Sequence, residues 1–165
     1  FGIEPGLLIG MVLAIGLYLQ STSDPHIAVV GQVPGTEHYR NIKRHKVHTW
    51  PALLLIRIDE NIYFANAPAI ESHIMDLVAN TNELQDVVLV LSGVAKIDAS
   101  GLEMVESISH SLMDAGVTLH LAEVKGPVMD HLATTSLLKT LSAARVHLST
   151  QAAVNALTQK KSSNA

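Results

Sequence analysis

The chain has 165 residues, a formal net charge of -4 at pH 7 and no cysteine, and 48% of its residues are hydrophobic against 16% charged. This length suits one domain with an appendage. The negative charge argues against nucleic-acid binding, and the absence of cysteine excludes a disulfide framework and thiol chemistry.

The N-terminal segment 1–19 is almost wholly apolar. Its one charged side chain is Glu4, and nothing charged follows between Pro5 and Thr22. The run is marginal for a bilayer-spanning helix, which needs about 20 apolar residues. It lacks the positive start and cleavage site of a signal peptide and the polar face of a surface helix. We expect 1–19 to be the end of a transmembrane helix, with a buried core helix as the alternative.

We expect a linker at residues 20–25. The chain begins with Phe1 rather than methionine, so we expect it to be a fragment of a longer protein.

Basic residues gather beyond the linker. Five of the eleven lysines and arginines lie between Arg40 and Arg57. They begin about twenty residues past the apolar segment, at the outer limit of the positive-inside bias, which predicts that the rest of the chain is cytoplasmic. The cluster is either a solvated linker or a surface for anionic lipid headgroups. The residues that would face the lipid are Arg40, Lys43, Arg44 and Lys46.

The first half of the domain shows two strand patterns, 27–33 and 53–58, and we expect the stretch between them at 36–49 to be a linker or an excursion. Asp59-Glu60-Asn61 is typical of a turn into 62–64, so we expect a hairpin there.

A helix follows this hairpin in the pattern. Asn66 is a favourable N-cap, and Pro68 is tolerated in a first turn. The apolar residues then recur on one helical face. They are Ile70, Ile74, Leu77 and Val78.

The most informative stretch is 87–101. Val87–Leu91 is an unbroken apolar run that favours a strand buried on both faces. Asp98-Ala99-Ser100-Gly101 then leads into a helix, and Ser100 with Glu103 matches a capping box.

The same position favours an anion, because free N–H groups and the helix dipole point at it. Ser100 is therefore also a candidate phosphorylation site, where Asp98 and Glu103 would oppose the phosphate. A cap and a charge switch are compatible, and the turn has no catalytic machinery of its own.

The remaining pattern alternates strands and helices, which predicts an α/β sandwich with helices packed against one mixed sheet. Leu119 and Leu121 share a strand face, and His120 points away from them. The expected elements are a helix ending at Gly116, a strand at 117–121, a helix at 127–132, an apolar patch at Leu137, Leu138 and Leu141, an edge strand at 146–148, a helix capped by Thr150 and carrying Val154 and Leu157, and a polar tail at 161–165.

The order of these elements resembles the cytoplasmic STAS domain at the C-terminus of a sulfate permease (SulP) family anion transporter, preceded by part of its last membrane helix. The resemblance runs essentially end to end and implies a STAS-like sandwich over residues 26–160. Its motifs are Pro25–Thr36 with Tyr39–Ile42, Ile62–Ala67, and Asp98–Gly101, a turn that STAS domains share with bacterial anti-sigma factor antagonists.

The resemblance implies a regulatory and assembly domain of a secondary-active transporter of sulfate, bicarbonate or dicarboxylate. It also implies protein docking near Ser100 and a homodimer in the intact transporter. Animal members carry a long insertion where this chain has only residues 79–86, so a bacterial inner membrane is expected, with the domain on its cytoplasmic side. Asp98, Gly101 and Glu103 would support the turn around Ser100.

Two alternatives remain open. Anti-sigma factor antagonists are phosphorylated at the serine that matches Ser100, so the chain would then be a phospho-switch protein that binds a regulatory partner. A nucleotide- or lipid-binding module is the third hypothesis, although Lys96 and Lys125 alone near the turn predict weak anion binding.

Enzyme and metal chemistry find little support. Among nine histidines, His45 and His48 are three apart, but no third ligand is near and a zinc site needs three or four. No nucleophile elbow, Walker loop or dinucleotide fingerprint occurs. We expect no enzyme, cofactor or metal, and we expect His73, His110 and His131 to be partly exposed on helices.

Overall fold

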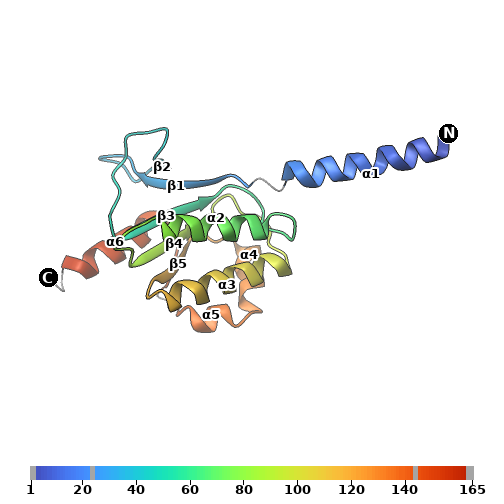
Figure 1. The fold of residues 1–165 in the computed structure, drawn as a ribbon. Coiled ribbons are helices and arrows are strands. Elements are labelled where there is room, and N and C mark those ends of the chain that lie inside the picture. Colours follow the sequence, from blue (N-terminus) through green and yellow to red (C-terminus); the bar gives the residue numbers. More distant parts are fainter. Residues whose placement is uncertain (1–2, 23–24, 143–144, 163–165) are drawn as a thin grey trace.

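The computed structural model describes residues 3–22, 25–142 and 145–162. Parts of the segments expected at 1–19, 20–25 and 161–165 lie outside these ranges. A six-stranded sheet forms the centre of the domain (Figure 1), and its strands are β1 (Ile27–Gln32), β2 (Tyr39–Asn41), β3 (Leu53–Ile58), β4 (Asp86–Val90), β5 (Thr118–Ala122) and β6 (Val146–His147).

The strand order is β2-β1-β3-β4-β5-β6. β1 runs antiparallel to both of its neighbours, whereas β3, β4, β5 and β6 are parallel to one another. The predicted α/β class with a mixed sheet is confirmed. The helices are α1 (Ile3–Thr22), α2 (Ala67–Ala79), α3 (Ala99–Asp114), α4 (Gly126–Ala133), α5 (Leu137–Thr140) and α6 (Thr150–Ser162).

Helices cover both faces of the sheet. Successive side chains of a strand point to opposite faces, and most of those of β3 are apolar and buried, on both faces. On β3, Leu54 and Ile56 belong to the buried cluster that includes residues of α2, α3, α4 and α5, whereas Leu53 and Leu55 belong to the cluster that includes residues of α6. The first layer is much the larger of the two. The buried helical residues of the α6 side are Ala153, Val154 and Leu157.

Two expectations about the first half of the domain are wrong. Residues 62–64 do not pair with β3. Instead Ile62 forms a parallel bridge with Ile97. The stretch at 36–49, expected to be a linker or an excursion, is not a plain linker, because it contains β2, which pairs with β1 and places Tyr39 against the α6 side of the core. Tyr39 also donates a hydrogen bond from its hydroxyl to Gln151 Oε1 at 2.9 Å, a contact that local sequence does not reveal.

The last helix is capped by Ser149 rather than by Thr150. The Ser149 hydroxyl accepts a hydrogen bond from Ala152 N at 3.1 Å. Thr150 is buried and instead donates from its hydroxyl to Glu123 Oε1 at 2.6 Å.

α1 extends away from the sheet at the start of β1 (Figure 1). The side chains described on it are exposed, and Leu7, Val12 and Leu17 are 68%, 68% and 65% exposed. Within the described residues, no helix reaches the length and hydropathy required to cross a membrane.

Candidate functional site

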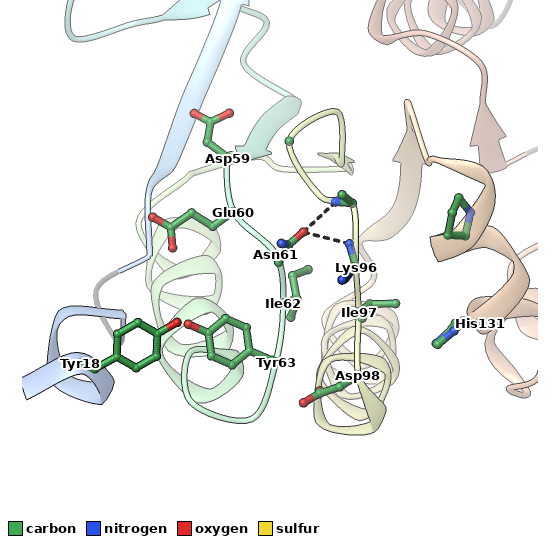
Figure 2. Close-up of a pocket in the computed structure, with 13 residues that line it drawn as sticks. Tyr18, Asp59, Glu60, Asn61, Ile62, Tyr63, Lys96, Ile97, Asp98 and His131 are labelled. Atoms are coloured by element: carbon green, nitrogen blue, oxygen red, sulfur yellow. Dashed lines mark hydrogen bonds between the residues drawn. The ribbon is translucent and has the colours of Figure 1, made fainter. Parts of the chain in front are cut away.

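A cleft of about 900 Å³ lies at the carboxyl ends of the parallel strands. In open α/β sheets, this is the edge at which ligands bind. The cleft is formed by the connections that follow β3, β4 and β5, and Tyr18 of α1 also reaches it (Figure 2). Its polar lining residues include Asp59, Glu60, Asn61, Tyr63, Lys96, Asp98 and His131.

Two asparagines hold the first two connections together. Asn61 Oδ1 accepts hydrogen bonds from the amides of Ala95 and Lys96, each at 2.9 Å (Figure 2). Asn66 is fully buried; its Nδ2 donates to Asn61 O at 2.8 Å and its Oδ1 accepts from Tyr63 N at 2.9 Å. The expected position of Asn66 at the N-cap of α2 is confirmed, but its side chain stabilises the preceding turn rather than the helix.

Asp98 caps α3, and this corrects the capping box expected from Ser100 and Glu103. Asp98 Oδ1 accepts from Gly101 N at 2.9 Å, and its Oδ2 accepts from Phe64 N at 2.9 Å. One carboxylate therefore caps the helix and also ties it to the β3–α2 connection. Ser100 cannot be the N-cap residue, because α3 starts at Ala99 and Ser100 is already inside the helix.

Glycine is required at two points where these connections touch. A Cβ at Gly101 would lie 2.6 Å from Ile97 Cγ1 and 2.8 Å from Ile62 Cγ2. A Cβ at Gly93 would lie 2.6 Å from Asp59 Cα, which belongs to the backbone and has little room to move. Gly101 was expected to support the turn, whereas Gly93 carries no signal in a single sequence beyond being a glycine after a strand.

Ser100 lies beside the cleft, half-buried in the first turn of α3. Among the residues that the structure describes, none makes a hydrogen bond to its side chain. The amides of Gly101 and Leu102 are already bonded to Asp98. Glu103 is exposed one turn further along, so negative charge flanks the serine on both sides.

The cleft carries more negative than positive charge. Asp59, Glu60 and Asp98 line it against Lys96 and a histidine, His131. The pKa of Tyr63 is raised, first by partial burial and then by the nearness of Tyr18 and Glu60. Sequence reasoning identified Asp98 here but missed Asn61, Tyr63 and His131, because the strand ends that bring them together are far apart in the chain.

The predicted basic cluster is divided by the structure. Arg40 and Arg44 line a second, smaller cavity of about 200 Å³, whereas Lys43 and Lys46 lie outside its lining. In the described parts of the chain, no group of three or more histidine, aspartate or glutamate side chains is placed to hold a metal ion.

The family model for the STAS domain matches residues 40–153 of this chain. The chain therefore belongs to the STAS domain family, and the resemblance drawn from its sequence is confirmed.

Curated relatives of the chain are sulfate transporters. Probable sulfate transporter 4.2 of Arabidopsis thaliana is 30% identical over 170 aligned positions, which cover 94% of this chain and 25% of the relative. High affinity sulfate transporter 2 of Stylosanthes hamata is 30% identical over 92% of this chain and 24% of the relative. The chain thus spans about a quarter of the length of these relatives.

Solved structures share the fold. The murine Solute Carrier 26 family member A9 anion transporter, in its inward-facing state, matches with a TM-score of 0.82 at 18% identity, over 93% of this chain and 25% of the transporter. The SulP transporter STAS domain of Vibrio cholerae gives 0.59 at 17% identity, over 73% and 93%. A putative anti-sigma factor antagonist of Thermotoga maritima gives 0.54 at 21% identity, over 63% and 86%.

Proposed function

We propose that the chain is the cytoplasmic regulatory and assembly domain of a secondary-active SulP-type anion transporter in a bacterial inner membrane. The transported anion would be sulfate, bicarbonate or a dicarboxylate, and the domain itself would bind rather than catalyse. One observation carries this proposal: a STAS domain follows α1 in the chain, and the apolar side chains described on α1 are exposed. Exposed apolar surface on this scale favours contact with lipid or with another apolar surface.

The cleft supplies a route by which binding at the domain would reach the membrane segment. α1 would be the end of a transmembrane helix, and Tyr18 from α1 lines the same cleft as Asp98. Asn61, Asn66 and Asp98 fix the connections that follow β3 and β4, so a partner meets a largely preformed surface on this part of the cleft.

The proposed docking surface is the rim of this cleft around Ser100 and Phe64, whose side chain is 63% exposed. A phosphate on Ser100 would add about two negative charges beside Asp98 and Glu103. Repulsion between these groups would change the surface that a partner meets. We further propose that the intact transporter is a homodimer, which its mass in nanodiscs would test.

The switch is tested with Ser100→Glu in the intact transporter. Ser111→Glu is the matched control, since it adds the same charge to the same helix about 16 Å further along. We expect Ser100→Glu to alter anion uptake or partner binding, Ser111→Glu to alter neither, and both variants to keep the wild-type melting temperature. Uptake and binding that stay unchanged in Ser100→Glu would count against a switch at this turn.

A second function is favoured by the fold shared with the anti-sigma factor antagonist and by the serine at the start of α3. The chain would then be a phospho-switch protein that captures a regulatory partner. Intact-mass analysis of native protein, with and without phosphatase treatment, would detect phosphate on Ser100.

An immunoblot with antibody against residues 26–165 separates the two functions. A membrane band several times the 17.7 kDa of this chain supports the transporter, and a band near 17.7 kDa supports the free-standing regulator.

A further inference from the structure

The second cavity lies where β1 begins and β3 ends, and positively charged side chains dominate its lining. Arg40, Arg44 and Arg57 line it together with His26 and His45. Asp59 N donates a hydrogen bond to His26 O at 3.0 Å, which closes this end of the β1–β3 pair. The cavity therefore lies at the end of the sheet from which α1 leaves the domain (Figure 1).

A single asparagine shapes the turn that presents the arginines. Asn41 O accepts hydrogen bonds from the amides of Arg44 and His45, each at 3.1 Å, and Asn41 Oδ1 accepts from Lys43 N at 2.8 Å. These three bonds hold the turn after β2 closed. Arg40, at the centre of β2, and Arg44, in the turn, are thereby brought to the same cavity.

The charges of these two arginines are not balanced within the cavity. Asp59 is the one carboxylate among the described lining residues, and Arg57 donates to it from Nε at 2.6 Å and from Nη2 at 2.9 Å. In the described part of the chain, no acidic side chain pairs with Arg40 or Arg44. This cavity carries surplus positive charge on a chain whose net charge is -4.

The position of the cavity near α1 indicates which kind of anion it would bind. α1 ends at Thr22 and β1 begins at Ile27, so only a short connection separates the exposed apolar helix from the cavity. If α1 lies in the membrane, the cavity lies close to the level of the lipid headgroups. Guanidinium groups match phosphate oxygens in shape and charge, and basic groups beside a membrane helix attract anionic lipids.

We infer that this cavity binds the phosphate of an anionic phospholipid headgroup through Arg40 and Arg44. The inference rests on the proposed function, because it requires α1 to be at the membrane. It goes beyond a diffuse basic surface, since it assigns binding to two arginines and excludes Lys43 and Lys46, which belong to the same segment but lie outside the cavity lining.

The test uses the full chain in a neutral detergent, titrated with dihexanoyl phosphatidylglycerol below its micelle concentration and followed by the amide NMR signals of residues 40–45. We expect saturable binding that Arg40→Gln/Arg44→Gln weakens about tenfold or more. Lys43→Gln/Lys46→Gln removes the same charge and should weaken binding less than about twofold. Equal weakening by the two double variants, or no saturable binding by wild type, would overturn the inference.

Two further titrations identify the source of the phosphate. Dihexanoyl phosphatidylcholine should not saturate the site, because its headgroup is neutral overall. Inorganic phosphate should bind much more weakly than phosphatidylglycerol. Equal affinity for inorganic phosphate would assign the cavity to a free anion and would contradict the lipid assignment.

Flotation with pure phosphatidylcholine vesicles tests the membrane role of α1 separately from headgroup binding by the cavity. Wild type and both double variants should float, because α1 anchors the chain whatever the headgroup. A chain that binds short-chain phosphatidylglycerol but does not float would refute the membrane role of α1; the phosphate-binding cavity would remain, but its assignment to a membrane lipid would fall with the proposed function. A chain that floats but shows no preference for phosphatidylglycerol would refute the site alone.

Discussion

The two cavities at this end of the sheet differ in charge and in the way they are held. The larger cleft is mainly acidic, and its walls are joined by side-chain hydrogen bonds between two connections and by close contacts at Gly93 and Gly101. The smaller cavity is mainly basic, and one turn around Asn41 shapes it. Asp59 lines both, because it follows β3 at the boundary between them.

In this domain, the residues expected to affect stability and those expected to affect binding therefore lie in different cavities. The acidic cleft has Ile62 and Ile97 of the core in its lining, and its walls are held by hydrogen bonds and close backbone contacts, so changes to these contacts should cost folding free energy. In the basic cavity Arg40 and Arg44 are exposed, so changes to these two side chains should alter binding while stability is nearly unchanged.

The largest expected effect is at Gly93. In Gly93→Ala the new Cβ would meet Asp59 Cα at 2.6 Å and Ile58 O at 2.7 Å, and backbone atoms cannot rotate away. We expect a loss of about 3 kcal/mol of unfolding free energy, the upper range for overpacking, measured by urea denaturation. Gly126→Ala is the control, since a Cβ there meets nothing within 4 Å. Equal stability of the two variants would contradict the close approach.

The second effect concerns the cap of α3. Asp98→Ala removes the acceptor for both Gly101 N and Phe64 N, so we expect a loss of about 2 kcal/mol. Ser100→Ala should cost less than about 0.5 kcal/mol, because its side chain makes no bond within the described structure. Urea denaturation of the two variants shows whether Asp98 or Ser100 caps α3. A larger loss of unfolding free energy in Ser100→Ala than in Asp98→Ala would support the capping box of Ser100 and Glu103 instead.

The third effect tests the boundary between the two cavities. The pKa of Arg57 is raised, mainly by its hydrogen bond to Asp59. In Arg57→Gln this partly exposed pair is lost, and we expect less than about 1 kcal/mol of destabilisation. The freed Asp59 carboxylate would repel an anion, so phosphatidylglycerol binding should weaken about threefold or more. A large loss of stability with unchanged lipid binding would reverse the distinction drawn between the cavities.

The smallest effect lies away from both cavities. His120, on β5, approaches His147 Nε2 with Nδ1 at 3.2 Å and Asp86 Oδ1 with Nε2 at 3.2 Å. The pKa of His147 is lowered from 6.5, first by burial and then by His120. The unfolded chain therefore takes up the proton more readily, so stability present above about pH 6.5 falls as the pH is lowered through the folded-state pKa.

His147→Gln should flatten this decline in melts between pH 7.5 and 5.5, and the control is His110→Gln, which replaces an exposed histidine on α3. An identical pH profile for His147→Gln and wild type would remove His147 as the cause.

Local sequence determined most of the secondary structure. The apolar run at Val87–Leu91 predicts β4, and the recurrence of Ile70 and Ile74 predicts the buried face of α2. Alternation places Leu119 and Leu121 in the core on β5. These features depend on periodicity and propensity over a few residues, which a single sequence records directly. The start of a helix near Asp98–Gly101 was likewise expected, although α3 begins at Ala99, inside the stretch expected to be a turn.

Tertiary structure alone decided which polar group meets which amide. Residues 62–64 have strand character, but the bonds from Asn61 to Ala95 and Lys96 draw them to the β4–α3 connection instead of back to β3. Asp98 rather than Ser100 caps α3 because the helix starts at Ala99, and the second oxygen of Asp98 also reaches Phe64, 34 positions away in the chain. The two cavities arise in the same way, since their lining residues are distant in sequence and meet only once the strands of the sheet have paired, the parallel strands for the acidic cleft and the antiparallel β2-β1-β3 strands for the basic cavity.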